Sequence, residues 1–108
     1  MKKIEITKRY NMYTVRNTVA AQPFDKLQVQ KIAKNETFEI LSISLEKDAV
    51  FPEHTSPTNA QLIVLEGDIF FYVKGETFHL KKQQHFSFAK EEKHWVRANE
   101  NSKFLIVR

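Results

Sequence analysis

Alternating apolar and polar residues dominate the chain and predict β-strands along most of its length. In the segment 37–46, Leu41, Ile43 and Leu45 fall on one face of such a strand and the two serines between them fall on the other. The same two-residue period predicts strands at 27–30, 78–80 and 86–88. The apolar, β-branched run 104–107 predicts a closing strand, and a short strand is expected at 12–15. Helical patterns are few, so the hydrophobic pattern indicates an all-β protein.

Two further segments, 62–65 and 69–73, are apolar at almost every position, which is typical of strands with both faces buried. Gly67 lies between them and Gly75 follows the second. Because glycine adopts positive φ without strain, both positions predict tight turns within one β-meander. Many short strands separated by turns of this kind predict a β-sandwich or a β-barrel.

The length and composition are consistent with one packed domain. A chain of 108 residues has room for a single core, so we expect one domain over residues 1–108. Hydrophobic residues make up 42% of the chain and nine are phenylalanine, which gains most from burial in a packed interior. Cysteine is absent from the sequence, which excludes disulfides and thiolate metal sites.

Neither a membrane nor a nucleic acid is an expected partner. The longest apolar runs are far shorter than the roughly 18 residues of a membrane helix, and the first residues lack the apolar core of a signal peptide. We therefore expect a cytoplasmic protein. The net charge is +4, but lysines and arginines are scattered, and Glu91 and Glu92 interrupt the one dense basic cluster. Such a surface favours no nucleic-acid site.

A candidate site begins at residues 52–68, which read PEHTSPTNAQLIVLEGD. Together with the following residues to position 98, this segment resembles the cupins, which are small jelly-roll barrels built as a double-stranded β-helix. The spacing of the two cupin motifs is kept across residues 48–98. His54 stands at the first histidine position of the first motif, and His94 stands at the histidine position of the second motif. The resemblance implies that residues 1–46 supply outer strands.

Several residues of the cupin metal site are replaced in this chain. Ser56 stands at the second histidine position and Ala60 at the glutamate position, with Gln61 taking that place if the spacer is one residue longer. A serine hydroxyl is a poor ligand for a transition metal, and alanine supplies no donor. We therefore expect His54 and His94 to provide two ligands at most, with no metal or a weakly bound divalent ion.

Three functions from different classes remain open. The first is binding of a small molecule in the barrel, with His54, Ser56, Gln61, His94 and Trp95 as contact residues, because apolar walls with a few polar groups form most such sites. The second is a metal-dependent oxygenase or an isomerase or epimerase that uses the two histidines, since resemblance to the cupins allows all of these. The third is a dimeric interaction module without catalysis. Whether the protein is an enzyme is left open.

The outer surface of the expected barrel predicts self-association. Phe70 and Tyr72 lie on the strand face opposite Phe71, and Ile63 and Leu65 also project away from their inward neighbours. Several large apolar residues exposed to water would form a hydrophobic patch that favours association. A homodimer that buries this patch is the simplest solution. The remaining histidines, at 79 and 85, are expected on solvated strand faces.

Overall fold

The structure, a computed structural model, describes residues 13–108. Its elements are α2 (Thr18–Ala21), β1 (Leu27–Lys34), β2 (Glu39–Leu45), β3 (Val50–His54), β4 (Ala60–Glu66), β5 (Asp68–Val73), β6 (Glu76–Lys81), β7 (His85–Phe88), β8 (His94–Ala98) and β9 (Ser102–Val107). Nearly every ordered element is a strand, so the prediction of an all-β protein is confirmed. Within the described residues, no helix is long and apolar enough to cross a membrane.

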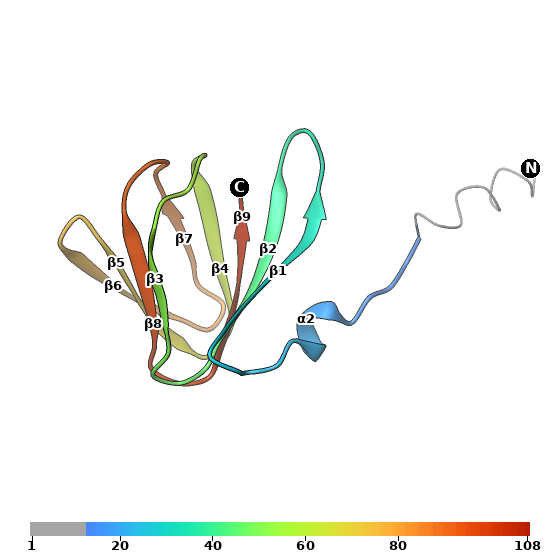
Figure 1. Cartoon of the computed structure of the whole chain (residues 1–108), viewed down its shortest axis with the longest axis horizontal. Helices are drawn as coiled ribbons and strands as arrows, with labels where there is room; N and C mark the ends of the chain where they lie inside the picture. The colour runs from blue at the N-terminus through green and yellow to red at the C-terminus, as the bar shows by residue number, and fades with distance from the viewer. Residues whose placement is uncertain (1–12) are drawn as a thin grey trace, which may run out of the picture.

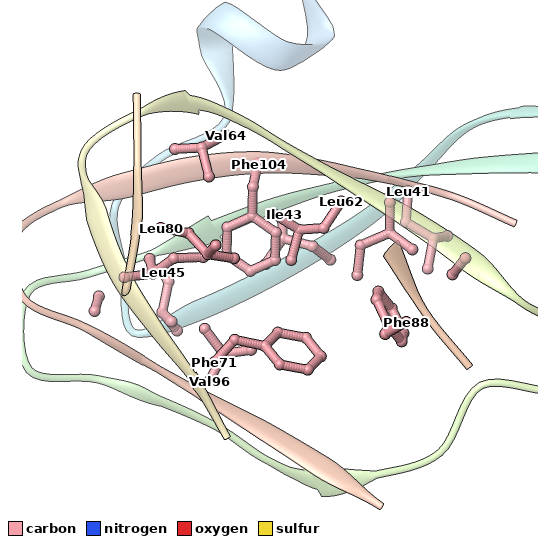
Figure 2. Close-up of a cluster of buried hydrophobic side chains, with 14 residues drawn as sticks. Leu41, Ile43, Leu45, Leu62, Val64, Phe71, Leu80, Phe88, Val96 and Phe104 are labelled. Atoms are coloured by element: carbon pink, nitrogen blue, oxygen red, sulfur yellow. The ribbon is translucent and has the colours of Figure 1, made fainter. Parts of the chain in front are cut away.

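The strands form two antiparallel sheets that pack face to face (Figure 1). The larger sheet has the order β1-β2-β9-β4-β7 and the smaller sheet has the order β3-β8-β5-β6. Side chains from both inner faces fill the space between the sheets, and Figure 2 shows Phe71 from β5 in the same cluster as Phe104 from β9. Both of these side chains are fully buried. Burial of each contributes about 2–3 kcal/mol.

The alternation in β2 determines which residues enter this core. Leu41, Ile43 and Leu45 face the interior and are buried, as their spacing predicts. Ser42 and Ser44 point to the opposite face, yet they are buried as well. A polar strand face that is withdrawn from water needs hydrogen-bonding partners, and here the N-terminal segment supplies them.

Residues 17–24 lie across the outer face of β2 and β9, as the position of α2 beside the larger sheet in Figure 1 illustrates. Gln22 donates a hydrogen bond to the carbonyl oxygen of Ser42 at 2.9 Å, and the Ser42 hydroxyl donates to Gln22 Oε1 at 2.7 Å. The buried ammonium group of Lys103 donates to the carbonyl oxygen of Val19 at 2.8 Å and to that of Ala20 at 3.1 Å. This segment therefore acts as a polar cover of the larger sheet.

Two predictions about the chain path are wrong. Residues 13–15 form no strand, and Met12, which completes the predicted strand at 12–15, lies outside the described residues. Gly67 does not join two strands of one meander, because β4 belongs to the larger sheet and β5 to the smaller sheet. The Gly67 junction instead carries the chain between the sheets. Gly75 does close a hairpin, in which Val73 pairs with Glu76.

Candidate functional site

Two strands of the smaller sheet bring together the two histidines that stand at the cupin motif positions. His54 ends the edge strand β3, and His94 begins its neighbour β8. Phe51 pairs with Val96 and His54 pairs with His94, so β3 has one residue more than β8 between these two pairs. Such a β-bulge turns a side chain to the other face of its strand. As a result, both Phe51 and His54 contact the interior, although their spacing in a regular strand would separate them.

The imidazole rings face each other through their Nε2 atoms, which lie 3.0 Å apart. Each Nδ1 atom approaches the carbonyl oxygen two residues earlier: His54 that of Pro52 at 2.7 Å, and His94 that of Glu92 at 2.9 Å. These three contacts require three hydrogens on the ring nitrogens, and two neutral imidazoles carry only two. With both Nδ1 atoms engaged by carbonyl oxygens, the two Nε2 lone pairs converge on the space between the rings, an arrangement suited to holding an electrophile.

Aromatic rings enclose the pair. His54 stacks on Phe51 with ring centroids 4.1 Å apart, and His94 stacks on Phe71 at 5.0 Å and meets the edge of Phe88 at 4.8 Å. His94 is only 1% exposed. Burial lowers the pKa of His94 below its usual value; the hydrogen bond to the Glu92 carbonyl opposes this change, and the nearby His54 reinforces it.

The other predicted contact residues lie elsewhere. Ser56 is buried, but its hydroxyl donates to the carbonyl oxygen of Thr58 at 2.7 Å. Gln61 is exposed on the outer face of the larger sheet, where it accepts a hydrogen bond from Ser87 at 2.9 Å. Trp95 points away from the interior and stacks on Tyr72 with centroids 3.7 Å apart. The structure therefore brings together His54 and His94, and it does not bring Gln61 or Trp95 to them.

The donor set around the histidines does not fit a firmly held metal. Two nitrogens 3.0 Å apart match the separation of about 3 Å between adjacent ligands with metal bonds of about 2.1 Å. However, the described residues contain no group of three or more histidine, cysteine, aspartate or glutamate side chains placed to hold an ion. Ser56 is engaged with Thr58, and Ala60 faces the core without a donor. Within residues 13–108, the side chains gathered at this point thus offer two ligands, which does not match the three or four donors of a firmly held metal.

An apolar pocket adjoins the histidine pair and was not predicted from the sequence. Its volume is about 370 Å³, and the inward-facing side chains of Val73, Phe78, Phe86 and Phe88 form its walls. Two of these wall residues contact His94 directly, since Val73 is its cross-strand partner and Phe88 its ring neighbour. We call this site the mouth pocket. The alternation of Phe78 with Leu80 in β6 and of Phe86 with Phe88 in β7 was a signal for it, but alternation alone does not distinguish a pocket wall from a filled core.

Charged groups surround the opening of the mouth pocket. Lys74, Glu76 and Glu92 all line it. Lys74 forms an ion pair with Glu92 at 3.1 Å. Among the described residues no ion pair includes Glu76, although this residue begins β6 on the same face as Phe78 and Leu80. The rim therefore carries two carboxylates and one ammonium group above hydrophobic walls.

A second cluster of polar groups lies on the outer face of the smaller sheet. His79 Nε2 and Asn99 Nδ2 both contact Asp68 Oδ1, at 2.6 Å and 2.7 Å. Burial raises the pKa of the Asp68 carboxyl group, but the hydrogen bonds from Asn99 and His79 outweigh it and leave the pKa below its usual value. This cluster fixes the start of β5 to β6 and to the loop after β8. We assign it a structural role, because its polar groups are engaged with one another.

Two facing antiparallel sheets, with a histidine from each of two paired strands directed into an aromatic interior, define a class of small jelly-roll barrels. A family model described as cupin domain matches residues 41–107, and the chain belongs to this family. None of the curated proteins matches the chain.

Solved structures support the same fold. An RmlC-like cupin protein from Desulfovibrio desulfuricans is 22% identical, with a TM-score of 0.78 over 88% of this chain and 94% of that chain. A conserved protein of unknown function from Streptococcus pyogenes is 21% identical, with a TM-score of 0.74 over 88% and 84%. A cupin superfamily protein from Desulfitobacterium hafniense is 12% identical, with a TM-score of 0.73 over 80% and 79%. At such identities the likeness establishes the fold and leaves function open, and it confirms the predicted jelly roll.

Proposed function

We propose that this cupin binds a small molecule in the mouth pocket, with His94, the buried member of the histidine pair, behind the pocket wall. The observation that supports this function is the open pocket of about 370 Å³ lined by three phenylalanine rings. Small-molecule sites are typically concave and mostly apolar, with a few polar groups near them. The phenylalanines are only partly buried at 78 and 86, so a ligand that covers them gains hydrophobic stabilisation.

The histidines give the site its polar component. Val73 and Phe88 both line the pocket and both contact His94. A bound molecule would therefore lie one side-chain layer away from His94. The proposal therefore expects ligand binding to change the NMR signals of His54 and His94. It does not depend on Gln61 or Trp95, which lie on outer faces.

A screen of small neutral and charged aromatic compounds tests the proposal. Chemical-shift changes in a nitrogen-15 NMR spectrum should concentrate on residues 73–78 and 86–92. Phe86→Ala should weaken binding, and Ala89→Trp, which adds bulk at the pocket, should block it while keeping the phenylalanine core. Phe38→Ala is the matched control, because Phe38 is 40% exposed and does not line this pocket. Shift changes that survive both pocket variants would contradict the proposal.

Metal-dependent enzyme chemistry remains the second candidate, and one observation favours it: the Nε2 atoms converge while both Nδ1 atoms are held by carbonyl oxygens. Carbonyl groups that orient imidazoles in this way are common behind metal-bound histidines. With two ligands from the chain, binding should be weak and should require a further ligand from substrate or water. Equilibrium dialysis against Ni²⁺ tests this candidate, and His54→Gln or His94→Gln should each abolish the bound metal.

A further inference from the structure

We propose that the mouth pocket selects a small aromatic molecule that carries an ammonium group, in preference to an anion or a neutral analogue. This inference rests on the proposed function, because it assigns a ligand class to the same pocket. It starts from the walls, where Phe78, Phe86 and Phe88 leave room for a body the size of one or two rings. Such walls reject heavily hydroxylated molecules, whose polar groups would lose their hydrogen bonds to water.

The position of Glu76 indicates the charge of the ligand. Glu76 shares its strand face with Phe78 and Leu80. It is the first residue of β6, two positions before Phe78, and it lies at the pocket opening. Glu76 is exposed, so its carboxylate stays solvated in the free protein and is available to a cation that enters the pocket opening. Lys74 is already paired with Glu92 at 3.1 Å. The rim therefore has one carboxylate more than it has ammonium groups, and a ligand cation complements it.

The walls favour a cation for a second reason. The face of a phenylalanine ring is electronegative, and a cation held over it gains attraction that a neutral or anionic group does not. Three such rings lie below the two rim carboxylates. Among the described residues, no arginine lines the pocket, and the Ser87 hydroxyl at its edge already donates to Gln61. The one lysine at the opening, Lys74, is paired with Glu92, so the described part of the site offers an anion no free cationic partner.

Three probes of nearly equal size separate the alternatives: benzylamine, which is protonated at pH 7, benzyl alcohol and benzoate. NMR titrations at low salt should give benzylammonium the tightest binding, about fivefold tighter than benzyl alcohol, with benzoate weakest. The preference for the cation should shrink as salt is added. Glu76→Gln should reduce this preference to near parity while leaving benzyl alcohol binding unchanged. Glu36→Gln, which removes an equal charge outside the pocket, should leave the preference intact.

The outcomes distinguish this inference from the function on which it rests. If the pocket binds benzyl alcohol or benzoate as tightly as benzylammonium, or if Glu76→Gln leaves a cation preference unchanged, the ligand class is wrong and the small-molecule function stands. If none of the three probes shifts the pocket resonances and the wider aromatic screen is also silent, both proposals fail. A cation preference that Glu76→Gln removes and Glu36→Gln retains supports the inference.

Discussion

Replacement of Gly67 by alanine should destabilise this protein far more than replacement of Gly75. Both glycines have positive φ, +92° at Gly67 and +74° at Gly75, where a side chain costs about 1–2 kcal/mol. The two positions differ in their surroundings. A Cβ atom at Gly67 would lie 2.2 Å from Ser102 Oγ, 2.5 Å from Ser102 Cα and 2.6 Å from the carbonyl oxygen of Asn101, whereas nothing lies within 4 Å of a Cβ at Gly75.

The contacts at Gly67 cannot relax by a side-chain rotation alone, because two of the three atoms belong to the backbone that leads into β9. Ser102 Oγ also accepts a hydrogen bond from the Asp68 amide at 3.0 Å, which ties β9 to the start of β5. Overpacking of this kind costs about 1–3 kcal/mol. We therefore expect a loss of about 2–5 kcal/mol for Gly67→Ala and about 1–2 kcal/mol for Gly75→Ala.

Urea unfolding followed by Trp95 fluorescence measures both values, and the two variants serve as controls for each other. The slope of unfolding free energy against urea should stay the same, so a shift of the midpoint reports stability directly. Equal destabilisation of the two variants, within about 0.5 kcal/mol, would refute the reasoning, because backbone strain alone would then explain both.

Three further predictions concern acid stability, the polar cover and the oligomeric state. Since burial lowers the pKa of His94, the unfolded chain binds more protons than the folded protein below pH 6.5. The free energy of unfolding should therefore fall between pH 6.5 and 5, by up to about 1.4 kcal/mol per pH unit. His94→Gln should flatten this pH dependence, and an unchanged slope of unfolding free energy against pH would contradict the prediction. Lys103→Met should lower the free energy of unfolding by about 1.5–3 kcal/mol, because it removes the hydrogen bonds to the Val19 and Ala20 carbonyl groups. Trypsin should then cleave after Arg16 faster than in the unchanged protein. An unchanged cleavage rate would contradict the role of residues 17–24 as a cover. Light scattering at micromolar concentration should give a mass of about 25 kDa, twice the chain mass of 12.7 kDa. The reason is that the half-buried Phe70 and Tyr72 form an apolar outer face that a second copy would cover. A monomer mass would contradict the dimer.

The inward face of most strands was predictable from local alternation. Leu41, Ile43 and Leu45 enter the core because a strand places every second residue on one face, and this holds whatever sheet the strand joins. The same argument correctly assigned Phe86 and Phe88 to one side of β7. The hairpin turn at Gly75 was also predictable, because a hairpin turn depends only on a few residues that are adjacent in the sequence.

The histidine pair was predictable in outline. Motif spacing indicated that His54 and His94 meet, and their Nε2 atoms lie 3.0 Å apart. The bulge that turns His54 inward was not visible, because it depends on the pairing of β3 with β8 rather than on either strand alone. Gln61 was grouped with the histidines by motif position and Trp95 because it directly follows His94, and strand parity within the folded sheets directs both outward instead.

The sequence by itself determined the strand character and the inward residues, because these follow from the period of apolar residues along the chain. Its resemblance to the cupin motifs implied that two histidines meet. The tertiary structure alone decided that Gly67 crosses between sheets, that residues 17–24 cover two serines and a lysine, and that three phenylalanines border an open pocket instead of a filled core. Each of these depends on contacts between segments far apart in sequence. The local hydrophobic pattern predicts which residues are buried, but it does not predict which distant segment packs over them.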